Sequence, residues 1–420
     1  MLFLAADLSR VGINTQKRFS FFAFHSPFLF LHRTGCGLGT KEMLMAFLCI
    51  PLALHYFCKR KIKKESMQEE IISRAATQAM QLLEGMIARP SFSREETAVA
   101  DFIEDFMQKC QLNPQRAGNN LWCVSPTMKS ERPTLLLNAH LDTVKPAAGW
   151  KHDPFTPTYE GDSLYGLGSN DCGGGLVSLL MAFMLLRCDE NLPYNLIFLA
   201  SAEEEVSGKG GIESVLPLLP HIDVAIVGEP TGMQPAIAEK GLMVLDVVAR
   251  GKAGHAARNE GVNAIYEALA DIEWFRSHHF EKISPLLGEV KMTVTVIQAG
   301  TQHNVVPAEC RFTVDVRSNE CYQNTELLDE IVRNVKSEVV ARSTRLNSSG
   351  ISLEHPLVQR AVAMGKKPFA SPTLSDQALM PFPSFKMGPG DSARSHTADE
   401  YIRRQEVEDA IRCYCSLLGN

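Results

Sequence analysis

Residues 196–210, with the sequence LIFLASAEEEVSGKG, join a short apolar run to three consecutive glutamates. The uninterrupted apolar run at 196–200 is typical of a strand that is buried on both faces of a sheet. Adjacent side chains at a strand end point in different directions, so one of Glu203, Glu204 and Glu205 can bind a metal while its neighbour faces the bound water. A solvated acidic turn would have the same sequence. The stretch therefore predicts a buried strand, and the role of its carboxylates depends on partners elsewhere in the chain.

The composition indicates a globular protein with more than one domain. The chain has 420 residues, of which 45% are hydrophobic and 21% are charged, and its formal net charge is -6. A chain of this length can form two domains with separate cores, and the lack of a basic surplus argues against nucleic acid as a partner. Small molecules are the expected ligands. The eleven cysteines form no CxxC pair, which indicates reduced thiols and a cytoplasmic protein.

The first 66 residues differ from the rest of the chain. Residues 43–57 form an apolar run, and residues 59–64 read KRKIKK. The run is shorter than the roughly 20 residues of a membrane-spanning helix, but the basic cluster after it would suit a membrane anchor with its C-terminal side in the cytoplasm. Alternatively, translation begins at Met67, where the pattern of a globular domain starts. We favour the second interpretation and a cytoplasmic location.

Two helices are predicted directly after Met67. Residues 68–87 carry apolar side chains at helical spacing. Ser93 and Glu96 have the spacing of a capping box, which predicts that Ser93 caps the second helix.

Two strands follow, and the second leads to the first candidate ligand. Residues 119–124 and 133–139 are the predicted strands. His140 and Asp142 follow the second strand. Residues two apart on an extended chain share a face, so Asp142 can hold one nitrogen of His140 while the other nitrogen binds a metal. A polar strand end without any ligand would have the same pattern.

A glycine-rich segment at residues 165–175, YGLGSNDCGGG, precedes an apolar helical run at 176–186. No GKS or GKT follows, and the spacing does not match a dinucleotide fingerprint, which argues against a phosphate loop. Asp171 lies in tight glycine turns at the start of a helix and is better placed to bridge metal ions. The buried strand predicted at 224–228 then ends at Glu229. Several strand ends thus present an acid or a histidine on one rim, where open α/β sheets carry their sites.

The pattern changes after residue 237. Strands are predicted at 242–250, 291–297 and 310–316, and helices at 263–277 and 325–339. This β-α-β-β-α order, closed by a further strand, predicts a ferredoxin-like module inserted into the first domain. The first domain resumes after the module, where His396 follows a glycine turn and Glu400 lies one helical turn later.

Five residues collected from these segments form a donor set for two metal ions. They are one aspartate and two pairs of acid and imidazole, namely His140, Asp171, Glu205, Glu229 and His396. The set suits two zinc ions of similar ligand type, each with one histidine and one carboxylate and both sharing Asp171.

The motifs around these residues resemble those of the co-catalytic zinc amidohydrolases, a family that includes acetylornithine deacetylase, succinyl-diaminopimelate desuccinylase, aminoacylase and glutamate carboxypeptidase. The resemblance runs from about Met67 to the C terminus and rests on HLDTV, YGLGSND, AEEE, VGEPT, GKAGHAA, NVVP and GPGDSARSHTADE. It implies an α/β fold with a zinc-peptidase-like, three-layer catalytic domain and a mixed central sheet. The catalytic domain would comprise residues 67–237 and 346–420, and residues 238–345 would form an inserted ferredoxin-like (α+β) dimerisation or lid domain.

The resemblance also implies a role for each ligand. His140 and Glu229 would hold one zinc ion, Glu205 and His396 would hold the other, and Asp171 would bridge the two. Co²⁺ or Mn²⁺ would be able to substitute for Zn²⁺.

Two further acids receive roles from the same resemblance. Asp142 resembles the acid that orients His140. Glu204 resembles the general base, which takes a proton from the metal-bound water and returns it to the leaving amine. The peptide bond between Asp171 and Cys172 is expected to be cis.

Residues of the inserted domain complete the implied site. His255 resembles a histidine that reaches into the active site of a neighbouring subunit to stabilise the oxyanion, which implies a homodimer. Asn304 and Arg317 resemble residues that contact the substrate carboxylate or the oxyanion.

The sequence departs from the pattern of the family at two positions. Glu203 stands where many members have aspartate, and Gly173 stands where many have lysine. Neither position is a ligand, so the implied chemistry is retained.

The leading function hypothesis is hydrolysis of the amide bond of an N-acyl amino acid in arginine biosynthesis. The substrates considered are N-acetylornithine and the N-acetyl or N-succinyl form of citrulline. A dipeptidase or aminoacylase of the same family is one alternative, and a metal-binding protein without catalysis is another.

Overall fold

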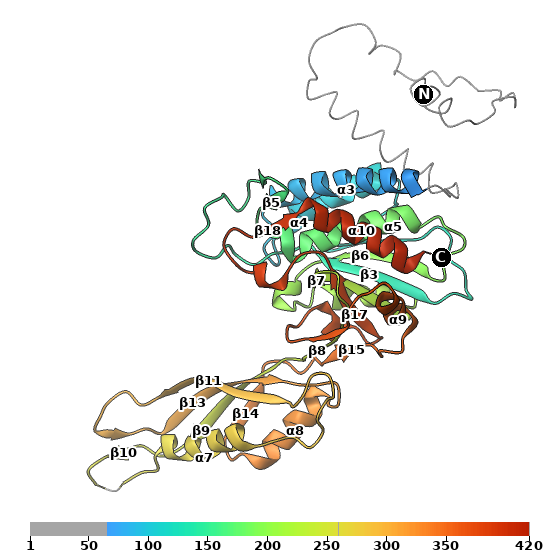
Figure 1. Cartoon of the computed structure of the whole chain (residues 1–420). Coiled ribbons are helices and arrows are strands. Elements are labelled where there is room, and N and C mark those ends of the chain that lie inside the picture. Colours follow the sequence, from blue (N-terminus) through green and yellow to red (C-terminus); the bar gives the residue numbers. More distant parts are fainter. Residues whose placement is uncertain (1–64, 259, 420) are drawn as a thin grey trace, which may run out of the picture. The chain divides into compact units, whose positions relative to one another are not determined.

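The computed structural model describes residues 65–258 and 260–419 (Figure 1). The apolar run at 43–57 and the basic cluster at 59–64 lie outside the described residues. Among the residues that are described, one helical stretch, Ser169–Leu186, is long and apolar enough to cross a membrane, but 89% of it is buried inside the protein. Such burial is typical of a core helix in a globular protein.

A nine-stranded sheet is built from residues on both sides of the insertion. Its strands are β1 (Gln115–Ala117), β2 (Asn120–Val124), β3 (Thr134–His140), β6 (Asn195–Ser201), β7 (Val224–Pro230), β8 (Ala236–Glu239), β15 (Ser349–Gly350), β16 (Phe369–Ser371) and β17 (Ser384–Gly388). They follow the order β1-β2-β6-β3-β7-β17-β8-β15, with β16 paired to β8. Strands β6, β3, β7 and β17 run parallel to one another, whereas β2 and β8 are antiparallel to their neighbours β6 and β17. The mixed central sheet is therefore confirmed.

Helices cover both faces of this sheet and give three layers. On one face α5 (Gly174–Leu186) packs against β3 and β7 and is in turn covered by α3 (Glu65–Ile87) and α10 (Arg404–Leu418) (Figure 1). Every residue of α5 except Leu185 is buried, because the helix is apolar all round and is enclosed between the sheet and the outer helices. On the other face Ile212 and Val215 of α6 (Ile212–Val215) join a core with Leu136 and Ile197 of the sheet.

The remaining elements of this part lie around the sheet. They are α4 (Thr97–Lys109), α9 (Pro356–Ala363) and a separate three-stranded sheet of β4 (Thr158–Glu160), β5 (Ser163–Tyr165) and β18 (Tyr401–Arg403).

The insertion forms its own sheet with helices on one face. Its elements are β9 (Met243–Arg250), β10 (Gly254–His255), α7 (Ala264–Ser277), β11 (Lys291–Ala299), β12 (Val305–Val306), β13 (Glu309–Arg317), α8 (Asn324–Asn334) and β14 (Glu338–Ala341). Four strands pair antiparallel in the order β11-β13-β9-β14, while β10 and β12 form a separate ribbon. Alternate residues of β9 are buried, and they share a core with Phe275 of α7 and Leu327 of α8. The period of two residues is that of a strand with one face against a core.

The predicted capping box at the second helix is wrong. Helix α4 begins at Thr97 with Glu96 as its N-cap residue, and no side chain caps it. The hydroxyl of Ser93 instead donates a hydrogen bond of 2.7 Å to the carboxylate of Asp142. In a capping box the serine oxygen would accept a backbone N–H, whereas here the hydroxyl donates to a buried carboxylate from another segment, a partner that local spacing does not reveal.

The helix predicted at 325–339 is too long. Helix α8 ends at Asn334, and β14 begins at Glu338. Between them the carboxylate of Asp271 accepts the N–H groups of Lys336 and Ser337 at 3.1 and 2.9 Å and so supports the turn into the strand. This contact comes from α7, more than sixty residues earlier in the chain.

Candidate metal centre

The predicted ligands lie where the parallel strands of the larger sheet end. His140 is the last residue of β3, Glu205 lies in the short turn that follows β6, and Glu229 lies near the end of β7. Asp171 belongs to the turn that precedes α5, and His396 to the loop after β17. The topology thus brings five residues that are distant in sequence to one edge of the sheet.

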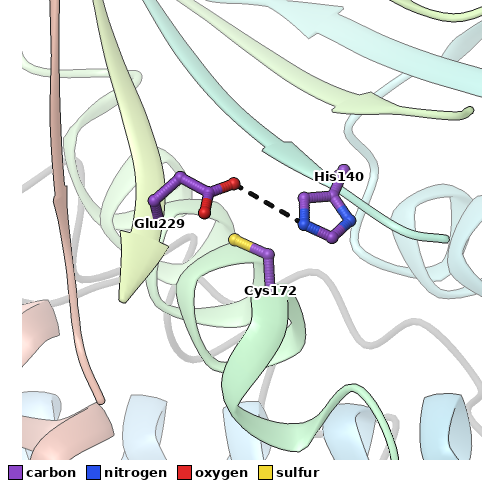
Figure 2. Close-up of side chains that lie close together, drawn as sticks. All are labelled: His140, Cys172 and Glu229. Carbon is purple, nitrogen blue, oxygen red and sulfur yellow. Dashed lines mark ion pairs between the residues drawn. The ribbon is translucent and has the colours of Figure 1, made fainter. Parts of the chain in front are cut away.

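The imidazole of His140 faces two carboxylates. Its Nε2 lies 3.2 Å from Oδ1 of Asp171 and 3.6 Å from Oε1 of Glu229. Figure 2 shows the carboxylate of Glu229 pointing toward this ring. Glu204 is slightly more distant, with its Oε2 4.0 Å from Nε2.

A second imidazole faces the other side of Asp171. Nε2 of His396 lies 3.0 Å from Oε2 of Glu205 and 3.6 Å from Oδ2 of Asp171. The two oxygens of Asp171 are therefore divided, Oδ1 toward His140 and Oδ2 toward His396. A carboxylate placed in this way can bridge two cations.

Asp142 is expected to hold one nitrogen of His140 with its carboxylate, but its main-chain oxygen makes the shorter contact with the ring. Nδ1 of His140 lies 2.9 Å from the main-chain oxygen of Asp142 and 3.6 Å from its Oδ1. The carboxylate of Asp142 accepts the N–H groups of Glu204 and Glu205 at 3.0 and 3.2 Å. Asp142 therefore links the ring of His140 to the turn that carries both glutamates.

The turn around Asp171 is held by a residue to which sequence reasoning gave no role. The carboxylate of Glu400, of which 2% is exposed, accepts N–H groups from Gly168, Asn170 and Asp171 at 3.1, 2.8 and 2.9 Å. The Asp171–Cys172 peptide bond that follows is cis, as the resemblance implies. The signal available in the sequence was the position of Glu400 one turn after His396, but nothing there indicated its acceptor role.

Cys172 is a second residue that sequence reasoning missed at the site. Its Sγ, a ring nitrogen of His140 and a carboxylate oxygen of Glu229 lie within 4.8 Å of one another (Figure 2). The thiol donates a hydrogen bond of 3.1 Å to the main-chain oxygen of Gly228. Cys172 thus packs beside the ligands and engages the backbone of β7.

Burial and crowding perturb the acids of the site. Burial, followed by the charge of Asp171, raises the pKa of Glu229 to about 8. Burial also raises the pKa of Glu204 well above its usual range. A hydrogen bond with Glu205 raises the pKa of His396 to about 9. Closely spaced carboxylates in a buried site favour either protons or cations between them.

The donor set fits divalent metal ions. Four carboxylates, those of Asp171, Glu204, Glu205 and Glu229, stand beside only two imidazoles. Oε1 of Glu229 is buried and accepts no hydrogen bond. A buried oxygen without a donor is costly unless a cation or a water meets it.

The residues expected from the inserted domain have their contacts within that domain. His255 is exposed at the end of β10, and its Nδ1 accepts the N–H of Ala257 at 3.2 Å. Arg317 pairs with the carboxylate of Asp315 through bonds of 2.8 and 3.1 Å, and Asn304 is exposed. Within residues 65–258 and 260–419, no hydrogen bond or ion pair joins these three side chains to the five ligands.

Comparison with known proteins places the chain in a family. The sequence model of peptidase family M20/M25/M40 matches residues 136–420. The chain belongs to this family. The resemblance noted in the sequence is thereby confirmed, and the chain is an M20 metallohydrolase.

Relatives extend the match over most of the described residues. The acetylornithine deacetylase of Proteus mirabilis (strain HI4320) is 26% identical over 373 residues, which are 81% of this chain and 96% of that protein. An aminopeptidase from Bacillus cereus has a TM-score of 0.65 at 16% identity and covers 82% of this chain and 98% of its own. A dinuclear metal-binding M20 peptidase from Bacillus subtilis has a TM-score of 0.61 at 15% identity, with coverages of 82% and 97%. The two structures establish that the fold is that of the M20 peptidases.

The role of Glu400 in this M20 site can be tested by metal titration. Glu400→Ala removes the acceptor of three N–H groups beneath Asp171, so we expect the affinity for divalent metal to fall by about 10- to 100-fold. Competition with a chromophoric chelator measures the change. Asp409→Ala, which removes an exposed acid of α10, serves as the control and is expected to bind metal like the wild type. Equal affinities in the two variants would contradict the role given to Glu400.

Proposed function

We propose that this M20 metallohydrolase cleaves the amide bond of an N-acyl amino acid, with N-acetylornithine, N-acetylcitrulline and N-succinylcitrulline as the substrates to be compared. The observation that carries the proposal is the division of the two Asp171 oxygens between two pairs of histidine and carboxylate, with Glu204 beside them. The similarity to an acetylornithine deacetylase along 96% of that enzyme supports the choice of substrate class and a place in arginine biosynthesis.

The metal ions proposed for the site are two zinc ions, for which Co²⁺ or Mn²⁺ can substitute. His140 and Glu229 would hold one ion, Glu205 and His396 the other, and Asp171 both. Histidine nitrogens and carboxylate oxygens are preferred zinc donors. When bound, the ions would lower the pKa of a water molecule and polarise the amide carbonyl.

Glu204 is the proposed general base. Its carboxylate lies 4.0 Å from Nε2 of His140, farther than the carboxylates of Asp171 and Glu229, and its main-chain N–H is bound by Asp142. A carboxylate that stands beside the ligands without being one is placed to accept the proton of the attacking water. It would then deliver that proton to the nitrogen of the leaving amine as the C–N bond breaks.

A homodimer is proposed because the inserted domain has an exposed apolar edge. Strand β11 ends the four-stranded sheet, and Val296 and Ile297 on it are 48% and 53% exposed. On α7, Tyr266 and Leu269 are 70% and 52% exposed. An unpaired edge strand with apolar side chains is suited to pair with a second copy. In such a dimer His255 would serve the site of the partner subunit and stabilise the oxyanion there.

A cytoplasmic location is proposed from the thiols. The eight cysteines among the described residues are all free. Free thiols of this number are expected in a reducing compartment.

The substrate class is tested by steady-state kinetics on the metal-loaded protein. We expect kcat/KM for at least one acetyl or succinyl form of ornithine or citrulline to exceed that for every dipeptide tested by about 10-fold or more, because the enzyme would use both ends of its substrate for recognition. A dipeptide as the best substrate would favour the peptidase alternative. Metal binding without any amide hydrolysis would favour a binding protein.

The base is tested by Glu204→Gln, which keeps the size of the side chain and removes its ability to accept a proton. We expect two metals to remain bound and kcat to fall by about 10²- to 10⁴-fold. Glu203→Gln is the matched control, because the Glu203 carboxylate contacts the N–H of Gly210 at 3.3 Å rather than either imidazole. Wild-type turnover in Glu204→Gln would refute the base assignment.

The sharing of the site between subunits is tested by complementation. His255→Ala and Glu204→Gln are each expected to be inactive, whereas a mixed dimer would contain one site with both residues intact. Because half of randomly mixed dimers are hybrids with one such site, about a quarter of the wild-type activity should return after subunit exchange. No recovery, in a mixture shown by mass spectrometry to contain hybrids, would argue against a shared site.

A further inference from the structure

The turn that carries Glu204 and Glu205 is bound through its backbone. Four consecutive N–H groups, those of residues 202–205, each donate to the side chain of a residue outside the turn. The N–H of Ala202 donates to Asn120 at 2.9 Å, that of Glu203 to Glu96 at 3.2 Å, and those of the next two residues to Asp142. We call the three acceptors, Asn120, Glu96 and Asp142, the amide clamp.

The members of the amide clamp are buried and come from three different segments. Glu96 and Asn120 are 0% exposed and Asp142 is 1% exposed. Glu96 precedes α4, Asn120 begins β2, and Asp142 follows β3. Consecutive N–H groups that converge in a turn form a concave site for an anion, and here two of the acceptors are carboxylates of the protein itself.

Glu96 binds the N–H of Glu203, the residue of the turn that has a left-handed backbone conformation. Glu203 has a φ of 55° and a ψ of 22°, the left-handed region that residues with a side chain seldom occupy. Its N–H is the group that Glu96 accepts. A residue held in this region persists only where its surroundings impose the conformation. The direction in which the next side chain, that of Glu204, leaves the backbone depends on that conformation.

Glu96 is itself fixed by further donors. Its Oε1 also accepts the N–H of Arg94 at 2.6 Å, and its Oε2 accepts the side-chain amide of Asn119 at 2.9 Å. The same segment supplies Ser93, whose hydroxyl binds Asp142 at 2.7 Å. Residues 93–96 therefore contain one clamp member and bind a second, which couples the entry to α4 to the acidic turn.

We infer that Glu96 is a positioning residue for the general base, acting through the N–H of Glu203 to hold the turn in the conformation that aims Glu204 at the attacking water. This inference rests on the proposed function. The reason is that Glu204 directly follows the residue that Glu96 holds, so a small rotation there would misdirect Glu204 first, whereas the N–H of Glu205 is still held by Asp142. Misplacement of a reacting group by about 1 Å can lower a rate by about 100-fold.

The test compares Glu96→Gln with Glu95→Gln. The N–H groups of Glu203 and Arg94 share Oε1 of Glu96, whereas the amide of Asn119 binds Oε2. A glutamine that keeps its oxygen toward Glu203 turns its N–H₂ group against the donor of Asn119, and its bond to Glu203 is no longer charge-assisted. Glu95 is the exposed neighbour of Glu96 and serves as the matched control. For Glu96→Gln we expect kcat to fall by about 10- to 100-fold with KM changed less than about threefold and with the metal content of the wild type. Glu95→Gln is expected to match the wild type in all three quantities.

Two further measurements separate positioning from a general structural role. In the Glu204→Gln background, Glu96→Gln should lower the residual turnover by less than about threefold, because there is no longer a base to position. Amide hydrogen exchange should be at least about 10-fold faster at residues 203 and 204 in Glu96→Gln than in Glu95→Gln. Exchange does not require turnover, so a wild type that hydrolyses no N-acyl amino acid would refute the proposed function and leave this measurement to decide whether Glu96 holds the turn.

Three results would overturn the inference. They are a kcat for Glu96→Gln equal to that of Glu95→Gln, full additivity of Glu96→Gln with Glu204→Gln, and unchanged exchange at the turn. If Glu96→Gln is recovered unfolded, Glu96→Asp is measured in the same way, because it keeps the charge and shortens the side chain by one methylene. An unchanged kcat in a folded Glu96→Asp protein, together with unchanged exchange, would likewise overturn it.

Discussion

Crowding of negative charge at one edge of a sheet is the constraint on which the rest of this structure depends. The carboxylates of Asp171, Glu204, Glu205 and Glu229 stand around two imidazoles in a largely buried site. Such a group is stable only if cations, protons or N–H donors meet the oxygens. The two imidazoles meet some of these oxygens, and the arrangement of the remaining oxygens suits two divalent cations. The same crowding places the carboxylate of Glu204 beside the predicted ligands, 4.0 Å from Nε2 of His140, where the proposed function makes it the general base.

Other buried acids bind the backbone of the turns that carry these carboxylates. Glu400 binds three N–H groups of the turn before α5, and Asp142 and Glu96 bind those of the turn after β6. Each directs its carboxyl oxygens to N–H groups of the backbone. A buried acceptor that binds several N–H groups is suited to fixing loops at the ends of strands. The site therefore has an inner group of acids that face the imidazoles and an outer group that binds the backbone of the turns.

The buried strands and the candidate ligands could be predicted from the sequence, because apolar runs and the residue types that bind metals are recognised locally. The apolar run at 196–200 lies within β6, and the five predicted ligands meet at one edge because parallel strands end there. The prediction failed where a distant partner decided the outcome. Ser93 has the spacing of a helix cap, but its hydroxyl binds Asp142, 49 residues away. The roles of Glu400 and Cys172 could not be predicted, since an acceptor of backbone N–H groups and a packed thiol have no characteristic spacing.

The sequence alone determined the order of the buried strands, the inserted module and the inventory of acids and histidines, because these follow from hydrophobic periodicity and from residue type. The tertiary structure decided which contact each of the three glutamates at residues 203–205 makes. Glu203 lies in the left-handed region with its carboxylate over Gly210, Glu205 faces His396, and Glu204 is left beside His140. Adjacent identical residues carry no local signal that distinguishes them. Only the contacts of their backbone with segments folded from elsewhere in the chain set the direction of each side chain.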